Sequence, residues 1–326
     1  MKLKVNEATI DIKQEVLRAA QRIRPYIRET PLEYSFHLSQ LSGSHVFLKL
    51  ENLQHTGSFK ARGAMNKLLS LTPVQRAKGV VAASTGNHGA AVAFGMNKLA
   101  MRGIVFVPEN ASPTKLEAIR ALGAEIQVHG KDSAITESYA RRYAEENGQT
   151  YVSPYNDPAI IAGQGTIAEE ISRQIDHVDA VFVSLGGGGM ISGIAGFLKS
   201  IDARVRVIGC SPENSPVMIE SIKANQIIEM ESQPTLSDGT AGGIEPNAIT
   251  FDLCRRLVDE YVKVSEDEIK AAMLLFMETQ HQLIEGAGGV AIAAFLKRQE
   301  FFRGKNIVIV ICGGNLSMET LRAILY

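Results

Sequence analysis

The 326-residue sequence contains no tryptophan and only three cysteines, Cys210, Cys254 and Cys312. An odd number of widely spaced cysteines favours neither a disulfide framework nor a CxxC metal site. We therefore expect reduced thiols, with Cys210 and Cys254 buried as small hydrophobic residues.

The sequence also lacks an excess of charge and any long apolar run. Its 34 Lys and Arg residues nearly balance 35 Asp and Glu residues, so the net charge of −1 offers no basic surface for nucleic acid or an anionic membrane. The apolar run from Ile307 to Cys312 is far shorter than the roughly 18 residues of a transmembrane helix. The N-terminus has no secretory signal, so we expect a cytoplasmic protein without membrane or nucleic-acid partners.

The sequence does contain a regular alternation of short apolar runs and amphipathic segments of helix length, which is typical of βαβ units. Strands are expected at 46–50, 79–83, 103–107, 125–128, 180–183, 205–210 and 306–311. Helices are expected at 58–70, 87–98, 113–122, 133–147, 158–174, 190–199 and 266–280. This alternation predicts an α/β fold whose parallel sheets are covered on both faces.

We expect two doubly wound parallel-sheet domains rather than one continuous sheet. The chain is expected to cross between them near Asn52 and again within SPYND, residues 153–157. The predicted boundaries are residues 1–52 plus 154–326 for a large domain and residues 53–153 for a small domain. Residues 230–249 carry turn-forming residues without periodicity, which indicates a functional loop.

Four consecutive glycines, Gly186, Gly187, Gly188 and Gly189, lie between a strand candidate and a helix that begins near Met190. Such a turn can direct its backbone N–H groups toward an anion, and the helix dipole adds positive potential. Neither the dinucleotide fingerprint nor the P-loop pattern fits the spacing, so a single phosphate is the expected ligand. The alternative is a tight turn packed against a neighbouring segment.

Lys60 follows Phe59 at the start of a predicted helix, within the sequence SFKARGA. Cations are disfavoured at the positive end of a helix, and that end lowers the pKa of an amine and makes it more nucleophilic. Lys60 is therefore a candidate nucleophile. A solvated surface lysine is the common alternative for this residue type.

A polar cluster follows the strand expected at 79–83 and opens the next helix. It consists of Ser84, Thr85, Gly86, Asn87 and His88. Its hydroxyl and amide donors could hold a carboxylate, or they could simply cap the helix. The motif CGGN, which begins at Cys312, likewise ends a strand at the ligand-facing edge of a parallel sheet.

Taken together and in this order, the motifs SFKARGA, STGNHG, GGGG, EGAGG and CGGN resemble those of the threonine/serine dehydratase and serine racemase family. These are fold-type II pyridoxal-phosphate enzymes with a tryptophan synthase β-like fold. The resemblance extends from about Ile23 to Leu321. It implies pyridoxal 5'-phosphate as the cofactor, held by the large domain, and a small amino acid as the substrate.

The resemblance also implies a role for each matching residue. Lys60 would hold the cofactor as a Schiff base, Phe59 would lie against its ring, and Asn87 would bind the ring hydroxyl. Cys312 stands where the family places a Ser or Cys against the pyridine nitrogen. The other implied cofactor contacts are Gly186, Gly187, Gly188, Gly189, Met190 and Glu285. The implied substrate contacts are Ser84, Thr85, Gly86, Asn87 and His88.

These roles predict an ammonia-lyase that eliminates water from threonine or serine and gives a 2-oxo acid and ammonia. Lys60 would abstract the α-proton, and the bound phosphate could protonate the leaving hydroxyl. A neutral thiol at Cys312 cannot keep the pyridine nitrogen protonated as a carboxylate would, which favours rapid loss of the β-hydroxyl. Ser84 is also a candidate proton carrier on the face opposite Lys60.

Two stretches depart from the family pattern. Relatives that resemble VIGVEP bind a divalent cation through that glutamate and a nearby aspartate, whereas Ser211 and Val217 stand at those positions here. Glu213 is displaced, so no metal site is expected. Typical catabolic dehydratases resemble DGTAVKRPG, whereas residues 238–246 read DGTAGGIEP, as in dehydratase-like proteins of ectoine and hydroxyectoine breakdown. The natural substrate therefore stays open.

Two alternatives to the dehydratase remain at this point. A serine racemase would use the same cofactor, with Ser84 as the acid on the face opposite Lys60. A nucleotide-binding oxidoreductase would use a doubly wound fold without pyridoxal phosphate. We expect a homodimer or homotetramer. Because CGGN ends at Asn315 and the sequence ends at Tyr326, no C-terminal regulatory domain is expected.

Overall fold

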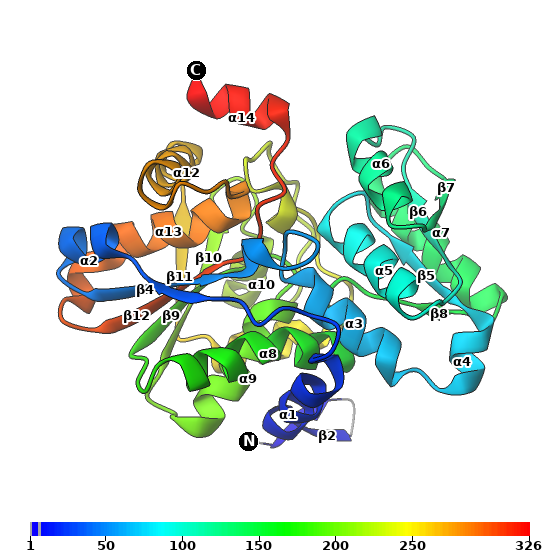
Figure 1. Cartoon of the computed structure of the whole chain (residues 1–326), viewed down its shortest axis with the longest axis horizontal. Coiled ribbons are helices and arrows are strands. Elements are labelled where there is room, and N and C mark those ends of the chain that lie inside the picture. The colour runs from blue at the N-terminus through cyan, green and yellow to red at the C-terminus, as the bar shows by residue number, and fades with distance from the viewer. Residues whose placement is uncertain (1, 6–7) are drawn as a thin grey trace.

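The computed structural model describes residues 2–5 and 8–326 and contains two separate sheets beside a short hairpin (Figure 1). The hairpin pairs β1 (Lys2–Val5) with β2 (Ala8–Asp11). The larger sheet has the strand order β11-β10-β9-β12-β4-β3, and the smaller has the order β7-β6-β5-β8. The predicted α/β class with parallel sheets is confirmed.

The larger sheet is parallel except at one edge. Its strands are β3 (Leu32–Tyr34), β4 (His45–Leu50), β9 (Ala180–Ser184), β10 (Arg206–Pro212), β11 (Glu260–Val264) and β12 (Asn306–Ile311). Only β3 runs antiparallel to its neighbour, β4. Alternate residues face opposite cores, so that Val181 and Val183 pack on one side of β9 and Phe182 on the other.

Helices cover both faces of this sheet, as Figure 1 shows. One face packs against α1 (Ile12–Ile23), α8 (Pro158–Gln174), α9 (Gly189–Ile201), α10 (Val217–Lys223) and α11 (Ile249–Leu257). The other packs against α2 (Phe36–Ser42), α12 (Glu266–Gln280), α13 (Gly286–Arg298), η3 (Gln299–Phe302) and α14 (Met318–Leu325). Burial on both faces explains why the central strands read as continuous apolar runs.

The smaller sheet is entirely parallel and has its own apolar cores. Its strands are β5 (Val80–Ala83), β6 (Gly103–Val107), β7 (Glu125–Val128) and β8 (Thr150–Tyr151). One face packs against α3 (Lys60–Ser70), α5 (Asn87–Lys98) and α6 (Pro113–Ala121), and the other packs against α7 (Ser133–Glu146). The short helix α4 (Pro73–Lys78) joins α3 to β5.

Helix boundaries follow local capping chemistry. A capping box begins α12, because the Ser265 side chain accepts from the Glu268 N–H and the Glu268 side chain accepts from the Ser265 N–H. The Asp157 side chain caps α8 by accepting from the Ala159 and Ile160 N–H groups, and Pro158 takes the first helical position. The helix expected from residue 58 begins at Lys60, since Ser58 instead forms an isolated bridge with Gly313.

The loop expected at residues 230–249 is irregular up to residue 248 apart from the short helix η2 (Asp238–Thr240), and α11 begins at Ile249. The three cysteines are free and buried. Across the described ranges, none of the helices combines the length and the apolarity needed to cross a membrane.

Candidate active site

The predicted clusters meet because each follows the carboxyl end of a parallel strand. The glycine loop follows β9, Cys312 follows β12, and Ser84 follows β5. Ligands of open α/β sheets bind at this edge. The sheets therefore carry the candidate residues to a common region.

Lys60 is brought to this edge by pairing between two distant segments. The Phe59 N–H donates to the Cys312 carbonyl (3.0 Å), Ser58 bridges Gly313, and the Gly314 N–H donates to the Gly57 carbonyl (2.9 Å). Gly57 has φ +70°, and a Cβ there would lie 2.6 Å from the Asn315 side chain. The pairing therefore requires glycine at this position and places Lys60 beside Cys312.

The Lys60 amine is buried and donates to a carbonyl rather than to a carboxylate. Its Nζ donates to the carbonyl of Pro154 (2.8 Å) and lies 5.2 Å from the centre of the Phe59 ring. Burial lowers the pKa of Lys60 to about 8, although the nearby Glu285 favours the charged form. An amine with this pKa is partly neutral near physiological pH, so it can act as a nucleophile and as a base.

The glycine loop is built so that side chains would not fit. A Cβ at Gly186 would lie 2.8 Å from the Thr240 carbonyl oxygen, and one at Gly187 would lie 2.5 Å from the Tyr155 ring. Gly188 has φ +85° and precedes α9, whose N-terminus has no side-chain cap. The first N–H groups of α9 therefore remain available to an anion.

Met190 contributes to this loop differently from the glycines. Its side chain is buried in the apolar core beneath the larger sheet. What Met190 can offer a phosphate is therefore its backbone N–H, in the first turn of α9.

Asn87 and Glu285 are in direct contact at the site. The Asn87 Nδ2 donates to both Glu285 carboxylate oxygens (2.9 Å each), and its Oδ1 accepts from Asn315 Nδ2 (2.6 Å). A Cβ at Gly313 would lie 2.5 Å from Glu285 Oε1, so the carboxylate rests directly on the CGGN backbone. This contact links the EGAGG, STGNHG and CGGN motifs.

Both acidic groups near Lys60 favour their protonated forms. Burial raises the pKa of Glu285 to about 7, although the Asn87 hydrogen bond opposes the shift. Burial also raises the pKa of the Cys312 thiol well above its usual value, and the proximity of Glu285 adds to the effect. Cys312 is therefore a neutral thiol at neutral pH.

The residues from Ser84 to His88 form a turn whose donors are mostly backbone groups. The Ser84 hydroxyl accepts from the Gly86 N–H (3.1 Å), and the space beside Gly86 is open. The His88 ring donates through Nε2 to the Val152 carbonyl (2.8 Å), and burial lowers its pKa to about 3. The His88 ring is therefore neutral and already bonded. The free N–H groups at the start of α5 remain for a carboxylate.

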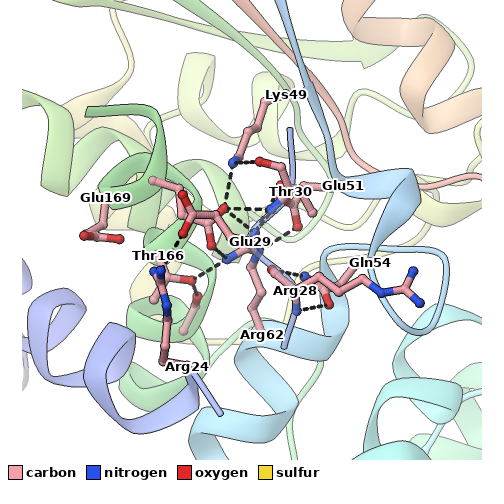
Figure 2. Close-up of polar contacts among 12 residues, drawn as sticks. Arg24, Arg28, Glu29, Thr30, Lys49, Glu51, Gln54, Arg62, Thr166 and Glu169 are labelled. Carbon is pink, nitrogen blue, oxygen red and sulfur yellow. Dashed lines mark hydrogen bonds and ion pairs between the residues drawn. The ribbon is translucent and has the colours of Figure 1, made fainter. Parts of the chain in front are cut away.

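A buried ion cluster fixes the helix that begins with Lys60 (Figure 2). Arg62 is fully buried and donates to Glu51 (2.7 and 2.8 Å) and to Glu170 (2.7 and 2.8 Å). These paired carboxylates raise the pKa of Arg62 despite its burial. Lys60 lies between Glu51 and Arg62 in the sequence. The cluster therefore holds the chain on both sides of Lys60.

The same cluster includes a second buried cation. Lys49 Nζ donates to Glu170 (2.6 Å), to the Thr30 carbonyl (2.7 Å) and to Gln174 (3.0 Å). The Thr30 hydroxyl donates to Glu51 (2.5 Å). Burial would raise the pKa of Glu170, but the two cations hold it below its usual value. Two cations thus face two carboxylates, and the buried charges balance.

Several residues at the site were not predicted from the sequence. Pro154 and Tyr155 contact Lys60 and the glycine loop, Thr240 packs on Gly186, and Asn315 bonds Asn87. All four lay within stretches already singled out, namely SPYND, the loop at residues 230–249 and CGGN. Their contacts join segments far apart in the sequence, which residue patterns alone do not reveal.

The divalent-cation positions of the relatives are occupied by other interactions here. The Ser211 hydroxyl is buried and donates to the Leu185 carbonyl (2.7 Å), and Val217 is buried in the apolar core. Within the described part of the chain, no three His, Cys, Asp or Glu side chains gather as a metal site would require.

Comparison with known proteins agrees with this geometry. The family model described as pyridoxal-phosphate dependent enzyme matches residues 23–313. The L-threonine ammonia-lyase of Thermotoga maritima is 41% identical over 96% of this chain and 77% of its own length. The catabolic L-threonine dehydratase TdcB of Staphylococcus aureus is 39% identical over 95% of this chain and 91% of its own length.

Solved structures show the same likeness. A maize serine racemase superposes with a TM-score of 0.90 at 31% identity, covering 96% of each chain. The processed threonine deaminase isoform 2 of Solanum lycopersicum has a TM-score of 0.91 at 33% identity, covering 96% of this chain and 92% of that one.

The chain belongs to the family of pyridoxal-phosphate-dependent enzymes, and the resemblance to the threonine/serine dehydratase and serine racemase group is confirmed. Its cofactor is pyridoxal 5'-phosphate, and its fold is that of fold-type II enzymes. The alternative of an oxidoreductase without this cofactor is thereby set aside. The site fits the cofactor, because it offers an amine of lowered pKa and a side-chain-free anion turn.

Proposed function

We propose that this chain is a lyase that eliminates water from L-threonine or L-serine and releases a 2-oxo acid and ammonia. The observation that carries the proposal is the Lys60 amine, whose pKa is lowered to about 8, beside the neutral thiol of Cys312. Relatives named L-threonine ammonia-lyase and L-threonine dehydratase support the reaction.

Particular residues would hold the cofactor. Lys60 would bind it covalently with Phe59 against its ring, Asn87 would bind the ring hydroxyl, and Cys312 would face the pyridine nitrogen. The glycine loop and the N-terminus of α9 would hold the phosphate. When bound, the cofactor supplies an electron sink for the negative charge that develops at the substrate Cα.

The chain's own groups then set the course of the reaction. The Lys60 amine can take the proton from the substrate Cα, because its pKa lies near the working pH. The neutral Cys312 thiol does not bring a second charge to the ring nitrogen, which favours prompt loss of the β-hydroxyl. The backbone donors of residues 84–88 would fix the substrate carboxylate and so orient the Cα–H bond toward Lys60.

The test is a substrate panel with detection of 2-oxo acid and ammonia. The panel contains L-threonine, L-serine and larger β-hydroxy amino acids. Lys60→Ala should abolish turnover without changing the circular dichroism spectrum, whereas Lys78→Ala, on the exposed helix α4, should remain active. Peptide mass mapping after borohydride reduction should place the pyridoxyl group on Lys60. A label on another lysine would overturn the assignment.

Serine racemase is a second candidate, favoured by Ser84 in the turn between β5 and α5 and by the maize structure. The two candidates differ in product, because a racemase forms D-serine and a dehydratase forms pyruvate. Chiral analysis of L-serine incubations separates them. D-Serine formed at a rate comparable with pyruvate would contradict the dehydratase assignment.

We also propose a cytoplasmic homodimer or homotetramer with two domains, residues 1–52 plus 154–326 and residues 53–153. Exposed apolar side chains on the larger sheet's helices support self-association, with Phe36 81% and Phe301 66% exposed. The separate cores beneath the two sheets support the domain division. Light scattering tests the oligomeric state, and limited proteolysis within residues 51–57 and 150–157 tests the domain division.

A further inference from the structure

Glu245 lies in the stretch where this chain departs from the typical dehydratase pattern, and its carboxylate is a junction between three segments. It accepts from Asn156 Nδ2 (3.0 Å) and from the Ser153 hydroxyl (3.3 Å), and it pairs with Arg141 of α7. Its backbone N–H donates to the Tyr155 hydroxyl (2.7 Å). The side chain of Glu245 is only 19% exposed, so these contacts are partly shielded from water.

The segment held by Glu245 touches the candidate active site directly. Pro154 lies between the two residues bonded to the carboxylate, Ser153 and Asn156, and its carbonyl accepts from Lys60 Nζ (2.8 Å). The Tyr155 ring packs against the glycine loop, where a Cβ at Gly187 would lie 2.5 Å away. Any shift of this segment would therefore move groups that contact both Lys60 and the glycine loop.

Arg141 is itself fixed on the smaller sheet. Its guanidinium pairs with Glu137 one turn earlier on α7 (2.7 Å) and stacks 4.2 Å from the centre of the Tyr151 ring on β8. A second, more exposed pair joins Lys115 of α6 to Asp238 (3.1 Å) in the same 238–246 stretch. The stretch is thus tied to the smaller sheet at two points, of which the Glu245 contact is the better shielded.

We propose that Glu245 is a positioning residue for the reaction, which acts through Arg141 and residues 153–156 to hold the smaller sheet's helix α7 and the Lys60 contact in register. The inference rests on the proposed function, because it assigns Lys60 the central role. A neutral or cationic residue at position 245 could not pair with Arg141. The role therefore belongs to the GGIE form of this loop rather than to the VKR form of typical catabolic dehydratases.

The test compares Glu245→Gln with Glu245→Asp in the holoenzyme, on whichever panel substrate is turned over. Glu245→Gln keeps the size and the hydrogen-bonding oxygen but removes the charge, so kcat should fall about tenfold, with a smaller change in KM. Cofactor content and Tm should change little. The pH at which the absorbance of the lysine-bound cofactor titrates should shift, because the Lys60 contact moves. Glu245→Asp should recover part of the loss.

A double-mutant cycle with Arg141→Gln isolates the pair. If Glu245 acts through Arg141, the double variant should be no slower than the slower single variant. Glu146→Gln is the control on the same helix, because it removes an exposed carboxylate that pairs with Arg142 instead of Arg141 and leaves Glu245 in place, and it should retain near-normal kcat. Losses of kcat that add up in the double variant would overturn the proposal. So would a lowered Tm that explains the loss of kcat while the titration of the cofactor absorbance stays unshifted. Failure of the proposed function would instead appear in the unmodified protein, as absent cofactor or absent product.

Discussion

At the scale of single residues, the site is defined by groups whose protonation differs from that in water. Lys60 and Glu285 are an amine and a carboxyl group whose pKa values, about 8 and about 7, are drawn toward neutrality by burial. Such values are typical of groups that exchange protons during turnover. Cys312, in contrast, stays protonated and contributes a neutral contact.

Glu285 gives a prediction for stability. Its pKa rises from 4.5 in the unfolded chain to about 7 in the folded one, so the folded state binds more protons between these values. The free energy of unfolding attributable to Glu285 is therefore greatest below pH 4.5 and falls as the pH rises through 7, by about 3 kcal/mol. Urea unfolding of the cofactor-free protein should show Glu285→Gln gaining stability over the unmodified chain at pH 8 but not at pH 4. The exposed Glu319→Gln is the control, and identical pH slopes for all three would contradict the shift.

Ser84 gives a prediction that separates the two candidate reactions. In a dehydratase its hydroxyl only supports the loop and the substrate carboxylate, so Ser84→Ala should act chiefly on substrate affinity, by about 0.5–1.5 kcal/mol. In a racemase the same change should remove D-serine formation while elimination from L-serine continues through Lys60. We expect the first result, measured as KM and kcat for pyruvate formation beside chiral analysis. If the unmodified protein forms D-serine and Ser84→Ala does not, the racemase assignment is correct.

The sequence predicted most of these residues because each sits in a short motif at a strand end or at the start of a helix. Lys60, Cys312 and the glycine loop were found from helix polarity, strand ends and glycine content, and the structure brings them together. The sequence did not predict the hydrogen bond between the His88 ring and the Val152 carbonyl, because that contact joins residues far apart along the chain. How each residue acts in turnover remains a prediction.

At the scale of elements, several long helices were predicted accurately, whereas short elements and the twelve-residue α1 were missed. The expected bounds of α5, α8 and α12 match the structure, because their apolar periodicity and caps agree. The two-residue β8 and the three-residue β3 are too short to show a pattern. Helix α13 was also missed, because its first turns (GAGG) have low helix propensity and are held by burial.

The turn between β9 and α9 gives a prediction at this scale. Gly188 has φ +85°, and a Cβ there would lie 2.8 Å from the Cys254 sulfur. Gly188→Asp adds strain and a negative charge where a phosphate is expected, so the dissociation constant for pyridoxal phosphate should rise about 10- to 100-fold. Gly304→Asp is a matched control, because φ is +73° and the surrounding space is open. Unchanged cofactor affinity in a dialysis titration of Gly188→Asp would exclude this turn as the phosphate site.

At the scale of the whole molecule, polar contacts between distant segments hold the site together. The Arg62 cluster joins β4, η1 (Glu51–Leu53), α3 and α8 (Figure 2). The Glu245 contacts join α7 to the 238–246 stretch. Arg62 lies within SFKARGA, so its importance had a signal in the sequence. Its partners Glu51 and Glu170 had none, because a charged residue beside an apolar run is usually solvated.

The Arg62 cluster gives the last prediction. Arg62→Met would leave Glu51 and Glu170 buried with Lys49 as the one remaining buried cation of the cluster, and an uncompensated buried charge costs about 3–5 kcal/mol of the free energy of unfolding. Urea unfolding of Arg62→Met should show a loss of that size, and adding Glu51→Gln in the same chain should recover part of it, because one buried carboxylate is then neutral. Arg173→Gln removes two partly exposed ion pairs, with Glu169 and Glu29, at the rim of the cluster and should change the free energy by less than about 1 kcal/mol. If Arg62→Met cost no more than Arg173→Gln, the buried charges would not be coupled as the hydrogen bonds indicate.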